Sequence, residues 1–350
     1  MWQDVPANNP LEGTAMKSLI YILIFIFIPV FSQAQPPADV RVTPQWVHST
    51  LTAADSQWMV VEVSWGPDGP KNGHLPGAIH INTDEIEYDT FPARRTTVKE
   101  KLGRSTSPEQ DLAKGISPTD TLPRNFWQLY PDAYLLPALA HMGITQDSRV
   151  IVTSHDILAA ARLTWTLLYA GVADVRILDG GSQAWTAAGF ALSQVNVPRQ
   201  PQKNFGRTTA RHPEYKAGVE TVKANLKDRK GRIVDVRTRP EFTGIWAPYS
   251  YIPTKGRIPG AVHIGSGDTP WDISQYLAPD KRFIDPKFLS QDWQAKGAND
   301  TGAIFYCGTG WRSSATFLLA RAAGWKEIRN MDGGWMVWSM DKKAGDNPVE

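Results

Sequence analysis

The chain has 350 residues, of which 42% are hydrophobic and 21% charged, and its formal net charge is +2. This length is natural for two ordinary domains, and 14 tryptophans in so apolar a chain argue against a disordered protein. The near-neutral charge, without a block of Lys or Arg, removes the electrostatic basis for nucleic-acid binding. Cys307 is the only cysteine, which excludes an internal disulfide and a cysteine-based zinc cluster.

An apolar run covers residues 19–31, with Met16 and Lys17 before it and residues 32–34, Ser-Gln-Ala, after it. A positive residue, a short apolar run and small residues at a cleavage site are typical of a secretory signal peptide. The run is shorter than the roughly 20 residues that cross a bilayer, which disfavours a retained anchor. We expect a signal peptide over residues 1–34 with its working start at Met16, export to the periplasm, and a mature form without a stable membrane span.

Two sequence patterns occur twice in the chain, in the same order. Gly73–Ile81 and Gly256–Ile264 share the pattern G-x-x-P-G-A-x-H-I, and Asp179–Trp185 and Asp332–Trp338 share the pattern D-G-G-x-x-x-W. Such self-similarity indicates a duplicated domain. The expected boundaries are residues 36–195 for the first copy, 196–202 for a polar, Pro-containing linker and 203–344 for the second copy.

Each copy alternates short apolar strands with a helical segment. The expected strand, helix and strand cover residues 150–153, 158–170 and 175–178 in the first copy and residues 303–306, 313–323 and 327–331 in the second. Apolar strands that alternate with helices predict a mainly parallel sheet with helices on both faces. We therefore expect two α/β domains, with functional residues at the carboxyl ends of the strands.

Cys307 follows an expected strand and precedes a helix that is expected to begin near Ser313. Gly308 and Gly310 allow a tight loop whose backbone N–H groups point inward. The helix N-terminus and the charge of Arg312 would lower the pKa of the thiol and keep it as the nucleophilic thiolate. We predict that Cys307 is the catalytic nucleophile. The residues predicted to bind an anionic substrate are Gly308, Thr309, Gly310, Trp311, Arg312 and Ser313.

The duplication supplies an internal comparison. Aligned on the D-G-G pattern, the first copy has residues 154–160, Ser-His-Asp-Ile-Leu-Ala-Ala, in place of the loop that begins at Cys307. The nucleophile, both glycines and the arginine are absent from it. Features that both copies share, such as the D-G-G turns, are therefore expected to be structural, and features that only the second copy has are expected to carry chemistry.

Asp235 and Arg237 occur only in the second copy as a pair, since Ser64 stands at the position of Arg237 in the first. Alternate residues at a strand end share a face, so these side chains either form an ion pair that stabilises the fold or support the loop. The second copy also carries an aromatic insertion over residues 243–253. The insertion is expected either to form a wall of the active site or to be a surface loop.

The motifs V-D-V-R and G-R-I-P-G-A-V-H-I, the strand–Cys–loop–helix segment and D-G-G-x-x-x-W occur in one order over nearly the whole mature chain. In this combination the chain resembles the rhodanese family, specifically the tandem-domain sulfurtransferases of the exported subgroup. The resemblance implies two rhodanese-like domains, an inactive first and a catalytic second. It also implies that Cys307 takes sulfane sulfur from a small anionic donor, thiosulfate or 3-mercaptopyruvate, and passes it as a persulfide to cyanide or a thiol.

The chain departs from the family pattern in two places. Residues 308–310, Gly-Thr-Gly, stand where thiosulfate-preferring members have basic residues, and they are similar to the Gly-Ser-Gly run of mercaptopyruvate-using members. Family members also have an arginine before the glycine that matches Gly244, where this chain has Glu241 or Phe242. Thiosulfate is the expected donor and 3-mercaptopyruvate the alternative. The histidines form no zinc-binding spacing, so no cofactor or metal is expected.

Two other functions fit parts of the sequence. Some phosphatases share this fold and use a Cys loop that ends in Arg, but their loops are longer than the segment from Cys307 to Arg312, which disfavours phosphate chemistry. A persulfide carrier or binding protein without turnover needs the same thiolate-stabilising loop as an enzyme. The sequence leaves this second function open.

Overall fold

The computed structural model describes residues 38–65, 72–87, 127–249, 252–340 and 347–350. The segment expected to be a signal peptide, residues 1–34, lies outside these ranges. Within them, the structure contains no helix with the length and apolar character needed to cross a bilayer.

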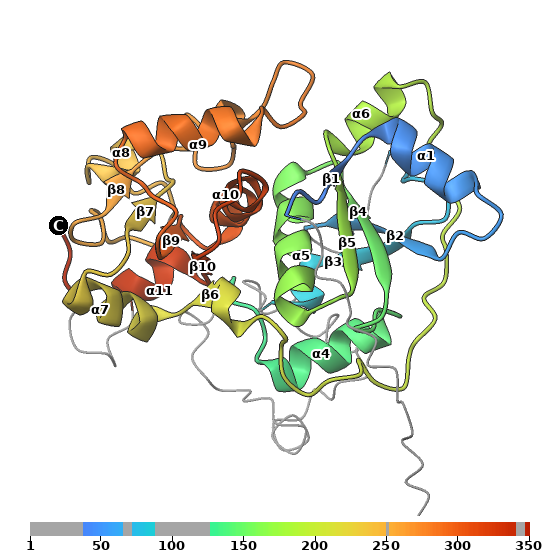
Figure 1. The fold of residues 1–350 in the computed structure, drawn as a ribbon, viewed down its shortest axis with the longest axis horizontal. Coiled ribbons are helices and arrows are strands. Elements are labelled where there is room, and N and C mark those ends of the chain that lie inside the picture. Colours follow the sequence, from blue (N-terminus) through green and yellow to red (C-terminus); the bar gives the residue numbers. More distant parts are fainter. Residues whose placement is uncertain (1–37, 66–71, 88–126, 250–251, 341–346) are drawn as a thin grey trace, which may run out of the picture. The chain divides into compact units, whose positions relative to one another are not determined.

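The described residues form two five-stranded parallel sheets (Figure 1). The strand orders are β1-β5-β4-β2-β3 and β6-β10-β9-β7-β8, so the same topology occurs twice. The first sheet contains β1 Arg41–Val42, β2 Trp58–Ser64, β3 Ile79–Asn82, β4 Arg149–Thr153 and β5 Asp174–Leu178. The second contains β6 Lys216–Ala217, β7 Ile233–Asp235, β8 Val262–His263, β9 Ala303–Tyr306 and β10 Ile328–Met331. The prediction of two α/β domains is confirmed.

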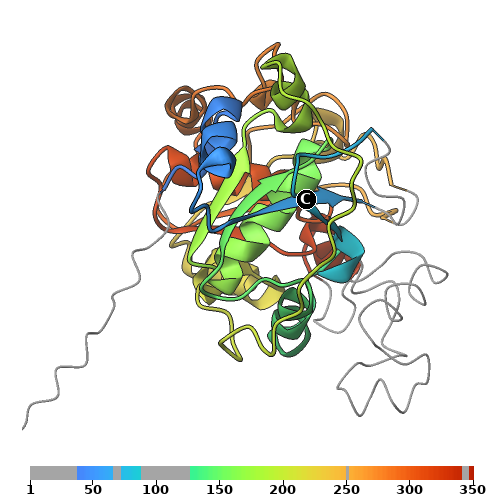
Figure 2. The same cartoon turned by 90° about the vertical axis from the view of Figure 1, so that its right-hand side faces the viewer.

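Helices cover both faces of each sheet (Figure 1 and Figure 2). In the first domain, one face carries α1 Pro44–Thr52 and α6 Gly181–Ala187, and the other carries α4 Asp132–His141 and α5 Ile157–Ala170. In the second domain, one face carries α7 Val219–Asp228 and α11 Gly334–Met340, and the other carries α9 Pro286–Ala295 and α10 Trp311–Ala322. The short helical segments are η1 Thr83–Glu85, η2 Pro213–Tyr215, α8 Arg239–Phe242 and η3 Ser274–Tyr276.

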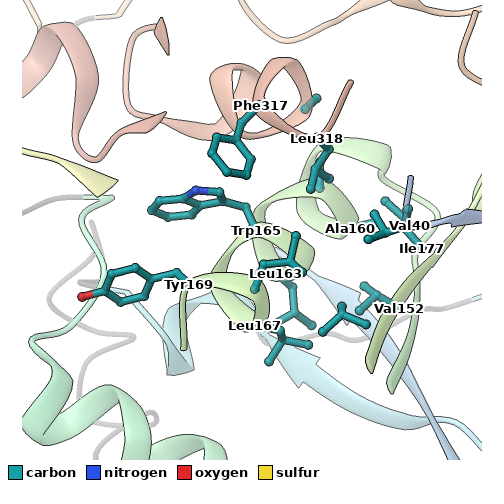
Figure 3. Packing of buried hydrophobic residues seen from close by; sticks show 14 of the residues in the cluster. Val40, Val152, Ala160, Leu163, Trp165, Leu167, Tyr169, Ile177, Phe317 and Leu318 are labelled. Atoms are coloured by element: carbon teal, nitrogen blue, oxygen red, sulfur yellow. The ribbon is translucent and has the colours of Figure 1, made fainter. Parts of the chain in front are cut away.

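Helices α5 and α10 pack against each other and join the two domains in one apolar cluster. Figure 3 shows Trp165 of α5 facing Phe317 of α10, while Leu167 turns toward Val152 of the first sheet. Nearly all of α5 is buried, its one charged and two threonine residues included. The packing between α5 and α10 therefore fixes the helix that begins at the Cys307 loop.

Helix α10 begins at Trp311, earlier than the start predicted near Ser313. Gly310 is its N-cap, with a φ of 104° in the left-handed region that glycine adopts without a Cβ penalty. The sharp turn at Gly310 lets the helix begin directly after the loop. Arg312 and Ser313 consequently belong to the first helical turn.

The second glycine of each D-G-G turn is required by a close approach of two backbones. A Cβ on Gly334 would lie 2.4 Å from the carbonyl oxygen of Cys307, and a Cβ on Gly181 would lie 2.2 Å from that of Ser154. In both domains the turn thus packs directly on the residue that follows the central strand. This contact explains why the pattern recurs in the copy that has no cysteine.

Candidate active site

Cys307 directly follows β9 and is buried, with 1% of its surface exposed. The Gly310 amide donates a hydrogen bond to Cys307 Sγ over 3.1 Å, and Ser313 Oγ lies 3.7 Å from the same sulfur. Asn330 holds the loop from its other side, because its side-chain nitrogen donates to the Gly310 carbonyl over 3.1 Å. The sulfur therefore lies inside a fixed loop, with the Gly310 N–H directed at it and the Ser313 hydroxyl nearby.

The surroundings of Cys307 favour its ionised form. Burial by itself raises the pKa of the thiol, but the positive charge of Arg312 and hydrogen bonds from Ser313 and the Thr309 amide outweigh it, so the pKa lies below its ordinary value. The thiolate is the nucleophilic form of cysteine. Cys307 is thus a buried thiol whose own loop favours the thiolate.

The guanidinium of Arg312 is engaged by protein groups. Its two terminal nitrogens donate to the Glu241 carboxylate over 3.1 and 3.0 Å, and Nη2 also lies 3.3 Å from the Tyr249 hydroxyl. Arg312 and Glu241 are each 2% exposed. In this structure Arg312 therefore acts on the sulfur through its charge, while Glu241 holds its nitrogens.

Tyr249 brings part of the aromatic insertion to the loop. Its hydroxyl donates to the Pro270 carbonyl over 3.0 Å, and its ring covers Gly308, where a Cβ would lie 2.8 Å from a ring carbon. Ile245 and Trp246 of the same insertion are exposed. One part of the insertion thus forms a wall beside Cys307, and another part is surface.

Asp235 and Arg237 form a buried ion pair, with 2.6 Å between Arg237 Nη2 and Asp235 Oδ2. Arg237 also donates to the Gly256 carbonyl over 2.8 Å and lies over the Trp335 ring, 4.8 Å from its centroid. The Trp335 amide donates to the Cys307 carbonyl over 2.8 Å. The pair therefore stabilises the fold and supports the loop indirectly, through Trp335.

Trp311 connects the loop to the first domain. Its indole nitrogen donates to Glu87 over 3.0 Å, and its ring meets the Trp127 ring edge-on at 5.4 Å. Glu87 also accepts a hydrogen bond from Arg162 Nε over 3.0 Å, and Arg162 reaches Asp332 over 2.6 Å. The Cys307 loop is therefore in contact with two buried polar side chains of the first domain, Glu87 and Arg162.

Residues 34–188 and 218–341 match the family model of the rhodanese-like domain. The chain belongs to the rhodanese family. The thiosulfate sulfurtransferase YnjE of Escherichia coli is 34% identical to it over an alignment of 361 positions, which covers 99% of this chain and 73% of that protein. With similarity of this extent, the chain is a rhodanese-like sulfurtransferase.

Further rhodanese relatives extend the comparison. The probable 3-mercaptopyruvate sulfurtransferase of Pseudomonas aeruginosa is 28% identical over 298 residues, covering 84% of this chain and 90% of that protein. The crystal structure of YnjE has a TM-score of 0.72 at 33% identity, covering 89% of this chain and 68% of that one. The anaerobic ergothioneine biosynthesis enzyme of Chlorobium limicola, solved with trimethyl histidine, has a TM-score of 0.72 at 27% identity, covering 89% of this chain and 70% of that one.

Three residues at the centre of this rhodanese site were not predicted as site residues. Glu241 has a local signal, because it forms a capping box with Thr238, whose side chain accepts from the Glu241 amide over 3.4 Å. That signal predicts a helix start and says nothing about Arg312. Glu87 has no local signal. Arg162 has a weak one, as the charged residue of the otherwise apolar helix α5.

The first rhodanese domain occupies the equivalent loop with its own side chains. Ser154 stands at the position of Cys307, and its hydroxyl donates to the Val63 carbonyl over 2.6 Å. Asp156 caps α5, because its Oδ1 accepts from the Leu158 amide over 2.9 Å. The carboxylate takes the place at the helix N-terminus where an anion would bind, and its charge would repel one. This arrangement suits a rhodanese domain without catalysis.

Glu62 is the first-domain counterpart of Asp235, but Ser64 stands where the second rhodanese domain has Arg237. The Glu62 carboxyl is 1% exposed, and its Oε1 lies 4.0 Å from His155 Nε2. Burial raises the pKa of Glu62 to about 8. The native protein therefore holds a proton on Glu62 over a wide range of pH.

The free energy of unfolding is expected to contain a term from Glu62 that decreases as the pH rises. The unfolded carboxyl has a pKa near 4.5, so the term is fully present below that pH and is lost as the pH rises through about 8. Between pH 6 and pH 7 the loss is about 1.4 kcal/mol. Urea unfolding at pH 6 and pH 7 should show that the free energy of unfolding falls less in Glu62→Gln than in the native protein, by this amount. The same pH dependence in both proteins would contradict a protonated Glu62.

Proposed function

We propose that the second domain transfers sulfane sulfur from thiosulfate, through a persulfide on Cys307, to cyanide or a thiol. The observation that carries this proposal is the buried thiol at the end of β9, held by the Gly310 amide at 3.1 Å, with a pKa that the charge of Arg312 lowers. Membership of the rhodanese family supports the sulfur chemistry. The similarity to a thiosulfate sulfurtransferase supports the donor.

The reaction consists of two displacements at sulfur. First, the Cys307 thiolate attacks the outer sulfur of thiosulfate, the sulfur–sulfur bond of thiosulfate breaks, and sulfite leaves with the electron pair. Cys307 then carries a persulfide. Second, cyanide or a thiolate attacks the terminal sulfur, so that thiocyanate or a new persulfide forms and Cys307 leaves as thiolate. The amides of Thr309 and Gly310 stabilise the thiolate before the first step and after the second.

The charges around the loop bear on the choice of donor. Arg312 is paired with Glu241 and Arg237 with Asp235. A doubly charged donor such as thiosulfate would therefore rely on the backbone N–H groups of the loop rather than on these guanidinium groups. The singly charged 3-mercaptopyruvate is the alternative donor, and the similarity to a probable 3-mercaptopyruvate sulfurtransferase supports it.

We further propose that residues 1–34 are a secretory signal peptide and that the mature protein acts in the periplasm. The apolar run over residues 19–31 after Lys17, and the Ser-Gln-Ala end at residues 32–34, support this proposal. In an oxidising compartment, a chain with one thiol cannot trap its own persulfide as an internal disulfide.

The proposed function is tested by mixing the native protein and Cys307→Ser with thiosulfate or 3-mercaptopyruvate. Intact mass spectrometry is expected to show the gain of one sulfur atom on the native protein alone. Addition of cyanide should then yield thiocyanate, and the variant should form none above the uncatalysed rate. Equal thiocyanate formation by Cys307→Ser would contradict the proposal that Cys307 carries the sulfur. Stable persulfidation without turnover would instead identify a sulfur carrier, and the comparison of donors identifies the preferred one.

A further inference from the structure

We propose that Glu87 and Arg162 of the first domain are positioning residues for the catalytic loop of the second domain. The domain without a nucleophile would then complete the reactive centre. The proposal rests on the proposed function in one respect, because it takes Cys307 as the reactive thiol. Three sets of contacts support it: those of Trp311, those of Gly310 and those of the second D-G-G turn.

Trp311 is the first residue of α10 and lies between two groups that act on the sulfur. Gly310 before it donates its N–H to Cys307 Sγ, and Arg312 after it supplies the charge that favours the thiolate. Glu87 holds the Trp311 indole, since its two carboxylate oxygens lie 3.0 and 3.3 Å from Nε1. A fully buried carboxyl of the first domain thus fixes the residue that joins these two groups.

Arg162 holds Glu87 in place and also contacts the loop itself. Its Nε donates to Glu87 Oε2 over 3.0 Å, and both side chains are fully buried. Among the residues that the structure describes, its buried Nη1 has no hydrogen-bond partner, and it lies 3.3 Å from the position that a Cβ of Gly310 would take. A buried N–H without an acceptor is destabilising. Hydrogen bonding therefore does not explain the placement of Nη1, whereas packing against Gly310 does.

The same guanidinium reaches the loop a second time, through the D-G-G turn. Arg162 Nη2 donates to Asp332 Oδ1 over 2.6 Å. Further along this turn, the Trp335 amide donates to the Cys307 carbonyl over 2.8 Å. Arg162 therefore packs against the loop directly at Gly310 and is connected to Cys307 through the D-G-G turn.

The first D-G-G turn makes a contact between the domains that corresponds to that of the second turn. Comparing the two distinguishes positioning of the loop from joining of the domains. Asp179 of the first D-G-G turn accepts the Phe283 amide of the second domain over 2.8 Å, and Asp332 accepts an amide of the first domain over 3.1 Å. Each turn thus binds the backbone of the other domain. Aligned on these turns, however, α10 has Ala315 where α5 has Arg162. The joining contact exists at both ends, but the buried guanidinium of the other domain is found at the catalytic end, whereas Asp179 has a guanidinium of its own domain 3.8 Å away.

Alkylation of the single cysteine tests the proposal, because iodoacetamide reacts with the thiolate. The rate is measured against pH for the native protein, Arg162→Met, Glu87→Leu and the matched control Asp179→Ala, with thermal unfolding as the measure of folding. We expect the pH midpoint to rise by about one unit, and kcat for thiocyanate formation to fall about tenfold, in Arg162→Met and Glu87→Leu. Asp179→Ala should keep the native midpoint and kcat even though its Tm falls.

Two further variants make the result decisive. Arg162→Lys keeps a positive charge beside Asp332 and should recover part of the lost kcat. If Arg162→Met and Glu87→Leu do not fold, Trp311→Phe decides, because it removes the N–H that Glu87 accepts, together with part of the ring, and leaves both buried partners in place. Native midpoints and kcat in folded variants would overturn the proposal and leave Glu87 and Arg162 a purely joining role. If the native protein transfers no sulfur, the alkylation midpoints still report positioning, so the two proposals fail separately.

Discussion

Arg312→Met is expected to lower the free energy of unfolding by about 3–5 kcal/mol, because it leaves the buried Glu241 carboxylate without its partner. The same variant should raise the pKa of the Cys307 thiol, since the charge of Arg312 lowers it in the native protein. Once the pKa lies above the assay pH, each further unit of rise reduces the thiolate fraction, and with it the rate of sulfur transfer, about tenfold. Urea unfolding and the pH dependence of Cys307 alkylation measure the two effects.

The double variant Arg312→Met with Glu241→Gln separates stability from reactivity. It removes both charges and keeps an oxygen that can accept from the Thr238 amide, which bonds Glu241 over 3.0 Å in the native protein. Stability should therefore recover most of the loss, while the thiol pKa stays raised. A double variant as unstable as Arg312→Met would show that the unpaired carboxylate is not the cause.

Gly334→Ala is expected to disrupt the catalytic loop by displacing the Cys307 carbonyl. Its Cβ would lie 2.4 Å from the Cys307 carbonyl oxygen, and the residue has a φ of 50°. Overpacking of this kind costs about 1–3 kcal/mol, and the left-handed conformation adds about 1–2 kcal/mol. Because the carbonyl that must move belongs to the nucleophile, sulfur transfer should fall by about a hundredfold. Thiocyanate assays and urea unfolding test this.

Gly181→Ala is the matched control for that variant. Its Cβ would lie 2.2 Å from the Ser154 carbonyl oxygen, at a φ of 55°, so the clash and the backbone strain are alike. The loss of stability should be similar, but the displaced loop contains no nucleophile, and the folded protein should keep its transfer rate. If both variants lose activity equally at a temperature where both are folded, the effect of Gly334→Ala is not local to Cys307.

Local patterns were sufficient to predict the duplicated α/β domains and the loop that carries Cys307. The alternation of strands and helices and the two D-G-G turns are local features, and the structure places the loop between β9 and α10. The start of α10 was predicted too late, because the left-handed conformation of Gly310 cannot be read from its neighbours. Fold and loop could thus be predicted, and the exact cap could not.

The partners of the loop could not be predicted, because they are distant in sequence. Glu241 lies 71 residues before Arg312, and Glu87 lies 224 residues before Trp311. Features restricted to the second copy do not include Arg162, which only the first copy has and which contacts the loop of the second. A residue of one domain that contacts the site of the other cannot be found by comparing equivalent positions of the two domains.

The packing of α5 on α10 also makes each copy depend on the other for the burial of its apolar surface. Here the fully buried Trp165 of the first copy and Phe317 of the second close one apolar cluster, and separating the copies would bring both rings into water. The second copy on its own would consequently expose an apolar face of the helix that follows the Cys307 loop.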